Sequence, residues 1–156
     1  MAKKILLAMD ESENAMRAAE FVTQTFKNDN EVTIFSVVLD TPTVCELDSP
    51  SLTPYFTAQK DAFCWVEDQK KMLIEEAHKK AGELLNKAGF DKKNIRTKIE
   101  TKKKGIAKGI LDEAGSGYDL LIMGRQGVAG TRDFLLGSIP QKILQSVKDV
   151  SVLLVD

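Results

Sequence analysis

The sequence lacks an excess of basic residues. Its 22 lysines and arginines are balanced by 23 aspartates and glutamates, which leaves a formal net charge of -1 at pH 7. Proteins that bind nucleic acids or anionic membrane surfaces normally carry a strong positive excess. We therefore expect neither nucleic acid nor a membrane among the partners, and any anion site must be built locally.

Long apolar runs are also missing. The first apolar run, Ile5 to Met9, is short and is broken by Asp10. It is too short for the core of a secretory signal and far too short for a transmembrane helix. The sequence therefore predicts a cytoplasmic protein.

Cysteine and histidine are scarce. The two cysteines, Cys45 and Cys64, are too few and too widely spaced for a zinc site or a redox C-x-x-C pair. We expect them to be reduced thiols, with a disulfide between them as the less favoured alternative. The single histidine, His78, lies far in sequence from every candidate site and is expected at or near the surface. Without a Ser-His-Asp set or a metal-ligand cluster, we predict no catalytic residue and no metal site made by side chains alone.

The sequence does contain a regular alternation of short apolar runs and amphipathic stretches. Its 156 residues, 43% of them hydrophobic, suffice for one domain spanning residues 1–156. The predicted strands are Lys3–Met9, Glu31–Leu39, Asn94–Thr101, Asp119–Met123 and Val150–Val155, and the predicted helices are Ser12–Lys27, Gln59–Ala88, Ile106–Ala114 and Ser138–Val147. Strands that alternate with helices indicate an α/β fold with a parallel sheet.

The order of the strands follows from the connections. Right-handed crossovers with two helices on each face favour a doubly wound five-stranded parallel sheet of order 3-2-1-4-5. The third strand alternates apolar and charged residues, as expected at a sheet edge. The chain reverses direction between the first and fourth strands, and ligands bind beyond the carboxyl ends of strands at such a point.

The longest predicted helix, Gln59–Ala88, has an apolar stripe at helical spacing. We expect the stripe to lie in the core, and its members are Phe63, Val66, Leu73, Ala77, Leu84 and Ala88. The preceding segment, Asp40 to Ala58, is rich in Pro, Ser and Thr and is long for a connection. It is predicted to be a lid or mobile loop, and an insertion without a function is an equal alternative.

Glycines at a fixed spacing follow the fourth apolar run. Gly124 and Gly127 form a G-x-x-G element, and nine residues later Gly137 and Ser138 open the last predicted helix. Glycines let the backbone approach a ligand closely, and a helix start offers unpaired N–H groups and a positive dipole end. Because a strand precedes and a helix follows, the pattern favours a phosphate cradle without a Walker lysine over a plain surface loop.

Three parts of the chain together resemble the universal stress protein family. They are the first strand ending in Ala-Met-Asp-Glu-Ser, the G-x-x-G-x9-G-S element and the closing Ser-Val-Leu-Leu-Val. The glycine element is similar to that of the ATP-binding branch, and the resemblance covers nearly the whole chain. It implies the doubly wound fold, ATP at the junction of the first and fourth strands, a role in stress response and a homodimer, which we expect to form through the C-terminal strand. We further expect Mg²⁺ or Mn²⁺ to bridge the phosphates.

The resemblance also implies, by position, which residues hold the nucleotide. They are Ala8, Met9, Asp10, Val38, Met123, Gly124, Gly127, Gly137, Ser138 and Ile139. Asp10 is the polar contact near the ribose, with helix capping as its alternative role, and Val38 is the apolar wall beside the base. Two residues depart from the family pattern, Glu11 in place of a usual glycine and Pro140 early in the last helix. Glu11 would repel a triphosphate unless it turned outward or shared a cation.

Three functions remain open. The leading one is a non-catalytic, nucleotide-dependent switch that binds ATP. The second is a slow ATPase or an ATP-using enzyme, for which no general base, metal carboxylate and arginine finger occur together. The third is a dimerisation module with a vestigial pocket, against which the intact glycines argue.

Overall fold

Strands and helices alternate along the part of the chain that the structure describes. This computed structural model describes residues 2–39, 54–102, 105–126 and 136–156. Its strands are β1 (Lys4–Ala8), β2 (Glu31–Leu39), β3 (Ile95–Lys102), β4 (Leu120–Gly124) and β5 (Ser151–Val155), and its helices are α1 (Glu13–Thr25), α3 (Pro54–Lys87), α4 (Ile106–Ala114) and α5 (Ser138–Ser146), with a 3-10 turn η1 (Lys92–Asn94). These boundaries match the predicted ones to within two residues, except that α3 begins earlier, at Pro54.

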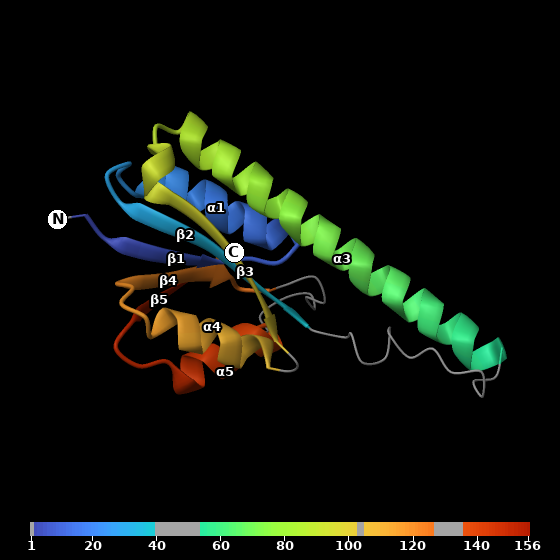
Figure 1. Cartoon of the computed structure of the whole chain (residues 1–156). Helices are drawn as coiled ribbons and strands as arrows, with labels where there is room; N and C mark the ends of the chain where they lie inside the picture. Colours follow the sequence, from blue (N-terminus) through green and yellow to red (C-terminus); the bar gives the residue numbers. More distant parts are fainter. Residues whose placement is uncertain (1, 40–53, 103–104, 127–135) are drawn as a thin grey trace.

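The sheet has five parallel strands in the order β3-β2-β1-β4-β5, as predicted from the sequence. Figure 1 shows three layers, with α1 and α3 on one face of the sheet and α4 and α5 on the other. β1 lies between β2 and β4, so its carboxyl end is the point where the direction of winding reverses. This confirms the predicted doubly wound topology and its switch point.

Each face of the sheet has its own apolar core. The cluster beneath α1 and α3 includes Leu7, Val22 and Ile34, and the cluster beneath α4 and α5 includes Leu6 and Phe35. All five of these side chains are fully buried. Neighbouring residues of β1 and of β2 thus point to opposite faces, which explains why these strands are apolar throughout.

A network of polar side chains joins the edge strand β3 to α4. Glu113 of α4 is 8% exposed, and its carboxylate accepts hydrogen bonds from Lys98 Nζ at 2.7 Å and from the Tyr118 hydroxyl at 2.9 Å. A buried carboxylate needs such partners to offset its lost hydration. The hydrogen bond to Glu113 also raises the pKa of Lys98. The network therefore holds α4 against β3.

The long helix α3 differs from the prediction in what it buries. Its buried residues are Ile74, Ala77, His78, Ala81 and Leu85, all in the second half of the helix. The predicted core residues Phe63, Val66 and Leu73 are 44%, 53% and 50% exposed, so for these positions, and for exposed Ala88, the prediction is wrong. The reason is visible in Figure 1, where the first half of α3 projects beyond the sheet and beyond the other helices of the described chain.

The segment before the predicted start of this helix is only partly described. Residues 54–58 are the first turn and a half of α3 and not a loop, while residues 40–53 lie outside the described part of the chain. Although α3 has 34 residues, neither it nor another helix in the described ranges is apolar enough to cross a membrane.

Cys64 lies on the projecting half of α3. It is disulfide-bonded, so the prediction of a reduced thiol is wrong at this position. The other cysteine, Cys45, lies outside the described residues. The prediction rested on the separation of the two cysteines along the sequence, which does not determine how far apart residues lie in the folded chain.

Candidate functional site

A cavity of about 350 Å³ opens at the carboxyl ends of β1 and β4, beside the first turn of α5. This is the switch point of the sheet, where ligands of open α/β folds bind. The cavity is large enough for a small molecule. The sequence-predicted residues that line it are Ala8, Met9, Asp10, Met123, Gly124, Gly137, Ser138 and Ile139. The fold thus brings the three predicted segments together at one hollow.

Much of the lining is apolar. Besides Met123, this part of the lining consists of Val37 of β2, Ile74 of α3, and Ile106 and Ile110 of α4. Val37 lines the cavity and the predicted Val38 does not. Successive side chains of a strand point to opposite faces, so an error of one residue moves the expected wall to the wrong side of the sheet. A surface of this kind suits a flat, weakly polar ring.

Asp10 organises the loop between β1 and α1. Its Oδ1 accepts a hydrogen bond from the backbone N–H of Ser12 at 2.9 Å. Ser12 in turn caps α1, because its Oγ accepts from the N–H of Ala15 at 3.1 Å. The cap of α1 is therefore Ser12 and not Asp10, which holds the loop before the helix and lines the cavity.

A buried hydrogen-bonded chain holds the end of β1 in place. The backbone N–H of Met9 donates to the carbonyl of Phe35 at 2.8 Å, and the hydroxyl of Ser36 donates to the carbonyl of Met9 at 2.6 Å. Nε2 of His78 lies 2.6 Å from the same Ser36 hydroxyl. Since the hydroxyl proton goes to Met9, Nε2 of His78 is the donor to Ser36. Met9, the residue before Asp10, is thus held through both its backbone N–H and its carbonyl.

His78 lies in the interior, and its expected surface position is wrong. It is 4% exposed, and its Nδ1 has no hydrogen-bond partner among the described residues. Protonation would place an unpaired positive charge in this interior, so burial lowers the pKa of His78 to about 4. The side chain is therefore neutral near pH 7. Sequence reasoning missed it because the contact joins α3 to β2 across 42 residues.

Gly124 lies against the start of α1 with little room for a side chain. A Cβ at this position would lie 3.1 Å from the backbone of Asn14, at the start of that helix. The Asn14 side chain also donates from Nδ2 to the carbonyl of Gln126 at 3.1 Å. The first glycine of the G-x-x-G element therefore lets α1 approach the end of β4. The second, Gly127, lies outside the described residues.

Among the described residues, no side chain caps the start of α5. Its N-cap residue is Gly137, whose own N–H already donates to the carbonyl of Arg125 at 3.0 Å. Pro140, the third helical residue, has no N–H. The backbone donors left for a ligand are those of Ser138 and Ile139, together with the Ser138 hydroxyl. If the start of α5 binds an anion, as predicted, Ser138 and Ile139 are the residues that would donate to it.

The charged side chains of the cavity are few. Asp10 and Glu11 supply carboxylates, and Lys70 of α3 is the one basic residue in the described lining. Oε2 of Glu11 is buried without a hydrogen-bond partner in the described part of the chain. Arg125 lies in the glycine segment but pairs with Asp156 at 3.1 Å. The described residues hold no group of three or more His, Cys, Asp or Glu that would bind a metal alone.

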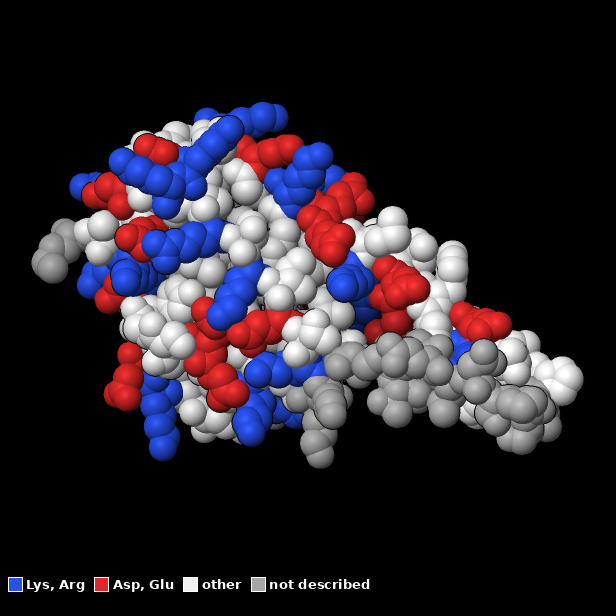
Figure 2. Space-filling model, viewed as in Figure 1, with Lys and Arg blue, Asp and Glu red and all other residues white. Residues whose placement is uncertain are grey.

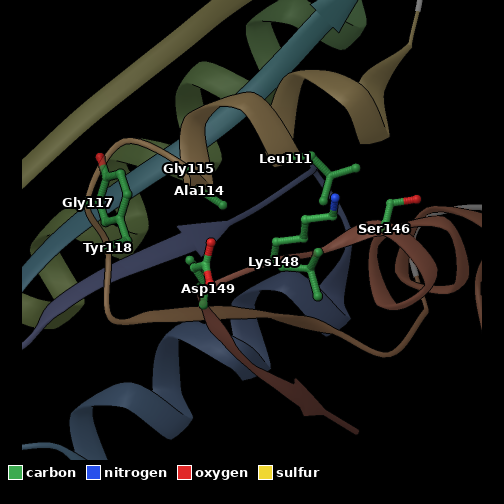
Figure 3. Close-up of a pocket in the computed structure, with 10 residues that line it drawn as sticks. Leu111, Ala114, Gly115, Gly117, Tyr118, Ser146, Lys148 and Asp149 are labelled. Atoms are coloured by element: carbon green, nitrogen blue, oxygen red, sulfur yellow. The ribbon is translucent and has the colours of Figure 1, made fainter.

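A second hollow of about 330 Å³ lies at the opposite end of the sheet (Figure 3). It is bordered by the C-terminal ends of α4 and α5, and in Figure 3 the Lys148 side chain reaches across it toward Leu111. Its described border has no helix N-terminus to offer free N–H groups to an anion, because the helix ends there are C-terminal ones. The strand-end cavity remains the candidate site.

Comparison with known proteins assigns the family. Residues 1–156 match the model of the Universal stress protein family. The chain belongs to the universal stress protein family. It matches no curated protein at the level of sequence.

Solved structures of other universal stress proteins share the fold. The universal stress protein UspA from Lactobacillus plantarum is 18% identical with a TM-score of 0.68, and the match covers 99% of this chain and 97% of that one. A universal stress protein solved in complex with cAMP is 17% identical with a TM-score of 0.63, covering 99% and 96%. The Archaeoglobus fulgidus protein in complex with dAMP is 14% identical with a TM-score of 0.61, covering 100% and 98%. Together they show that this family fold accommodates adenine nucleotides in other members.

Proposed function

We propose that the strand-end cavity binds ATP and that the protein acts as a nucleotide-dependent switch in a stress response. The observation that carries the proposal is the meeting of an apolar wall with an uncapped helix start in one cavity. Val37, Ile106 and Met123 suit the adenine, and the donors of Ser138 and Ile139 suit the phosphates. The cAMP and dAMP complexes of related proteins support an adenine nucleotide as the ligand.

The switching role rests on which elements the ligand would touch. The cavity is lined by residues of β1, β4, α4 and α5, and also by Lys70 and Ile74 of α3. A ligand that contacts α3 and the sheet at once favours those arrangements in which both are in place. We therefore expect nucleotide binding to hold α3 in place against the sheet.

We propose that the phosphates of the nucleotide and the carboxylate of Glu11 together hold the divalent cation. A buried carboxylate oxygen without a partner is costly, and a divalent cation would satisfy it. One carboxylate with phosphate oxygens and water is the arrangement in which Mg²⁺ is commonly held. We therefore propose that Glu11, the departure from the family pattern, contacts the metal and does not oppose the phosphate charge.

Glu11→Gln is expected to remove most of the Mg²⁺ dependence of ATP binding. Wild-type affinity should fall by about tenfold or more when Mg²⁺ is replaced by a chelator, because the Glu11 charge then faces the phosphates unscreened. The Gln variant should bind with similar affinity in both conditions. Titration calorimetry with and without Mg²⁺ measures both proteins. Equal Mg²⁺ dependence in the two would exclude Glu11 as a metal contact.

We propose binding without rapid turnover. Asp10 and Glu11 are the carboxylates of the described lining, and Oδ1 of Asp10 already accepts from Ser12. A slow ATPase or an ATP-using enzyme is the second candidate, and a module with a vestigial pocket is the third. Mass spectrometry of gently purified protein tests the proposal, since retained adenine nucleotide is expected and would be absent from a vestigial site. Phosphate release at about one turnover per second would favour the enzyme.

We also propose a homodimer through β5, the edge strand after β4. Its residues Val152, Leu153 and Leu154 are only partly buried in the single chain. The edge carries no charge or proline between Ser151 and Val155, so its backbone is open to pairing. A second copy related by a two-fold axis would extend the sheet.

Val152→Lys or Leu154→Lys is expected to break this interface, because two like charges would meet near the axis. Light scattering should show at least a tenfold rise in the dissociation constant of the β5 contact. Thr97→Lys is the matched control, since it adds the same charge to the other edge strand, β3. Thermal unfolding confirms that the variants fold. An assembly of unchanged mass in both β5 variants would rule the interface out.

A further inference from the structure

The first half of α3 presents an apolar surface that no part of the described chain covers. None of residues 54–73 is buried, and this half of the helix projects past the sheet in Figure 1. At 1.5 Å per residue, these 20 residues extend about 30 Å. Most of the stability of a helix in a protein comes from the packing of an apolar face, and this half of α3 has no such packing within the described chain. Residues 54–73 are therefore a candidate surface for contact with another molecule.

One side of this half-helix carries no charge. At about 100° per residue, nine residues share an arc of roughly 140°. We call them the outer stripe, and they are Tyr55, Ala58, Gln59, Ala62, Trp65, Val66, Gln69, Met72 and Leu73. The outer stripe is turned by about a third of a revolution from the face that buries Ile74 and Ala81 in the core. It is therefore a separate surface and not a continuation of the core face.

The outer stripe is large enough for a stable contact. Its five large side chains are strongly exposed, with Tyr55 at 74%, Trp65 at 65%, Met72 at 61%, Val66 at 53% and Leu73 at 50%. At ~150–250 Å² for a large side chain, they leave on the order of 600 Å² of exposed surface on each chain. Two such surfaces together give about 1,200 Å², the lower limit for a specific interface. A patch of this size on one helix marks an interaction site.

The charges around the outer stripe favour a second copy of the chain over a lipid surface. The other positions of the half-helix hold three lysines and three acidic residues, which are Lys60, Asp61, Glu67, Asp68, Lys70 and Lys71. A helix that lies on an anionic membrane needs a basic polar face, and this one has no net charge. Two outer stripes that face one another bring no like charges together. Two polar side chains of the stripe are paired with each other, since Gln59 Nε2 donates to the Tyr55 hydroxyl at 2.6 Å.

We infer that the outer stripe is a self-association interface, in which the first half of α3 pairs with the same half-helix of a second copy. The pairing is isologous, so one set of residues serves both chains. It is separate from β5. With both contacts in place, the dimer formed through one surface can join a second dimer through the other.

The sole tryptophan reports on this pairing directly. Trp65 is at the middle of the outer stripe, so its emission should be blue-shifted in the assembled protein and should move to the red on dilution. The experiment combines this emission with light scattering in the full chain carrying Val152→Lys, which removes the proposed β5 contact. That variant should remain a dimer at micromolar concentration.

Adding Val66→Glu and Leu73→Glu should produce a monomer with red-shifted emission and at least a tenfold higher dissociation constant. Both positions are exposed, so circular dichroism should show the helix content unchanged. Lys71→Glu is the matched control, because it changes charge on the opposite side of the helix, and its mass and emission should match the parent.

Three outcomes would overturn the inference. The first is emission that does not change on dilution together with an unchanged mass in the Val66→Glu, Leu73→Glu variant. The second is a monomeric parent whose emission shifts only with phosphatidylserine–phosphatidylcholine vesicles, which would make the occupant a lipid surface. The third is equal dissociation of the Lys71→Glu control, which would show that charge alone, and not the outer stripe, governs assembly.

Discussion

Lowering the pH from 7 to 4 is expected to cost the fold about 3 kcal/mol through His78 alone. The pKa of His78 is about 4 in the folded protein and 6.5 when exposed. Between these values the unfolded chain binds a proton that the folded chain excludes, so stability falls as the pH falls. The contribution of His78 is fully present above about pH 6.5. Urea unfolding followed by circular dichroism from about pH 7 to 4 measures the loss.

His78→Gln separates this effect from that of the carboxylates, which also titrate in this range. A glutamine amide can donate to Ser36 but cannot be protonated, so the variant should lose less stability on acidification than the wild type. The difference between the two pH profiles is the contribution of His78. Parallel profiles would show that His78 is not buried as a neutral side chain.

Ser138→Asp is expected to abolish tight binding of ATP while leaving the fold intact. A carboxylate in the first turn of α5 interacts favourably with the helix dipole, so the helix is not weakened. The same carboxylate occupies the position proposed for the phosphates and replaces a donor by a repelling charge. Loss of one hydrogen bond to a charged group costs about 1.5–3 kcal/mol, which corresponds to at least about a tenfold weaker affinity.

Adenosine serves as the internal comparison for this variant, because it has no phosphate to repel. Its affinity should be nearly equal in the wild type and in Ser138→Asp. Ser138→Asn, which is uncharged and of similar size, is the matched control and should retain most of the ATP affinity. If Ser138→Asp binds ATP normally, the phosphates do not lie at the start of α5.

Most of the fold followed from local patterns in the sequence. β1, β2 and β4 are short apolar runs between amphipathic helices, and the right-handed crossover rule then left few strand orders to consider. β3 is the edge strand, as expected, and none of its residues is fully buried. Local pattern and global fold agree in these elements, which is why their boundaries matched so closely.

For the first half of α3, the helical spacing of apolar residues did not predict which side chains are buried. An apolar stripe looks the same in sequence whether it faces the core of its own chain or another molecule. Phe63, Val66 and Leu73 fit the helical period, yet the sheet ends before it reaches them. The position of the helix over the sheet decides between the two cases, and that position is a property of the assembled fold.

The sequence predicted those cavity residues that lie at the ends of strands or at the start of a helix. It did not predict the residues that reach the site through contacts between distant parts of the chain. Met9, Asp10 and Ser138 were found because strand ends and helix starts leave signals in the sequence. His78, Lys70 and Ile74 come to the site from α3, and no local pattern places that helix over the cavity. Gly124 was identified, but its close neighbour is the backbone of Asn14, which only the packed structure reveals.

The distribution of charge on the face drawn in Figure 2 agrees with an anion site that is built from groups inside the cavity. In Figure 2, basic and acidic residues are interspersed over the domain, and no broad area of one sign appears on this face. Long-range attraction of a polyanion would need such an area. Selectivity for a phosphate ligand must then come from the few groups inside the cavity, chiefly the donors of α5 and Lys70.

The central claim, that the strand-end cavity binds ATP, is tested most directly by calorimetric titration of the nucleotide-free wild-type protein with ATP in the presence of Mg²⁺. The account predicts saturable binding of one ATP per chain, which is weakened at least about tenfold by Ser138→Asp and is unaffected by Val66→Glu on the outer stripe. No detectable heat with ATP, ADP or AMP, or binding that Ser138→Asp leaves unchanged, would contradict it.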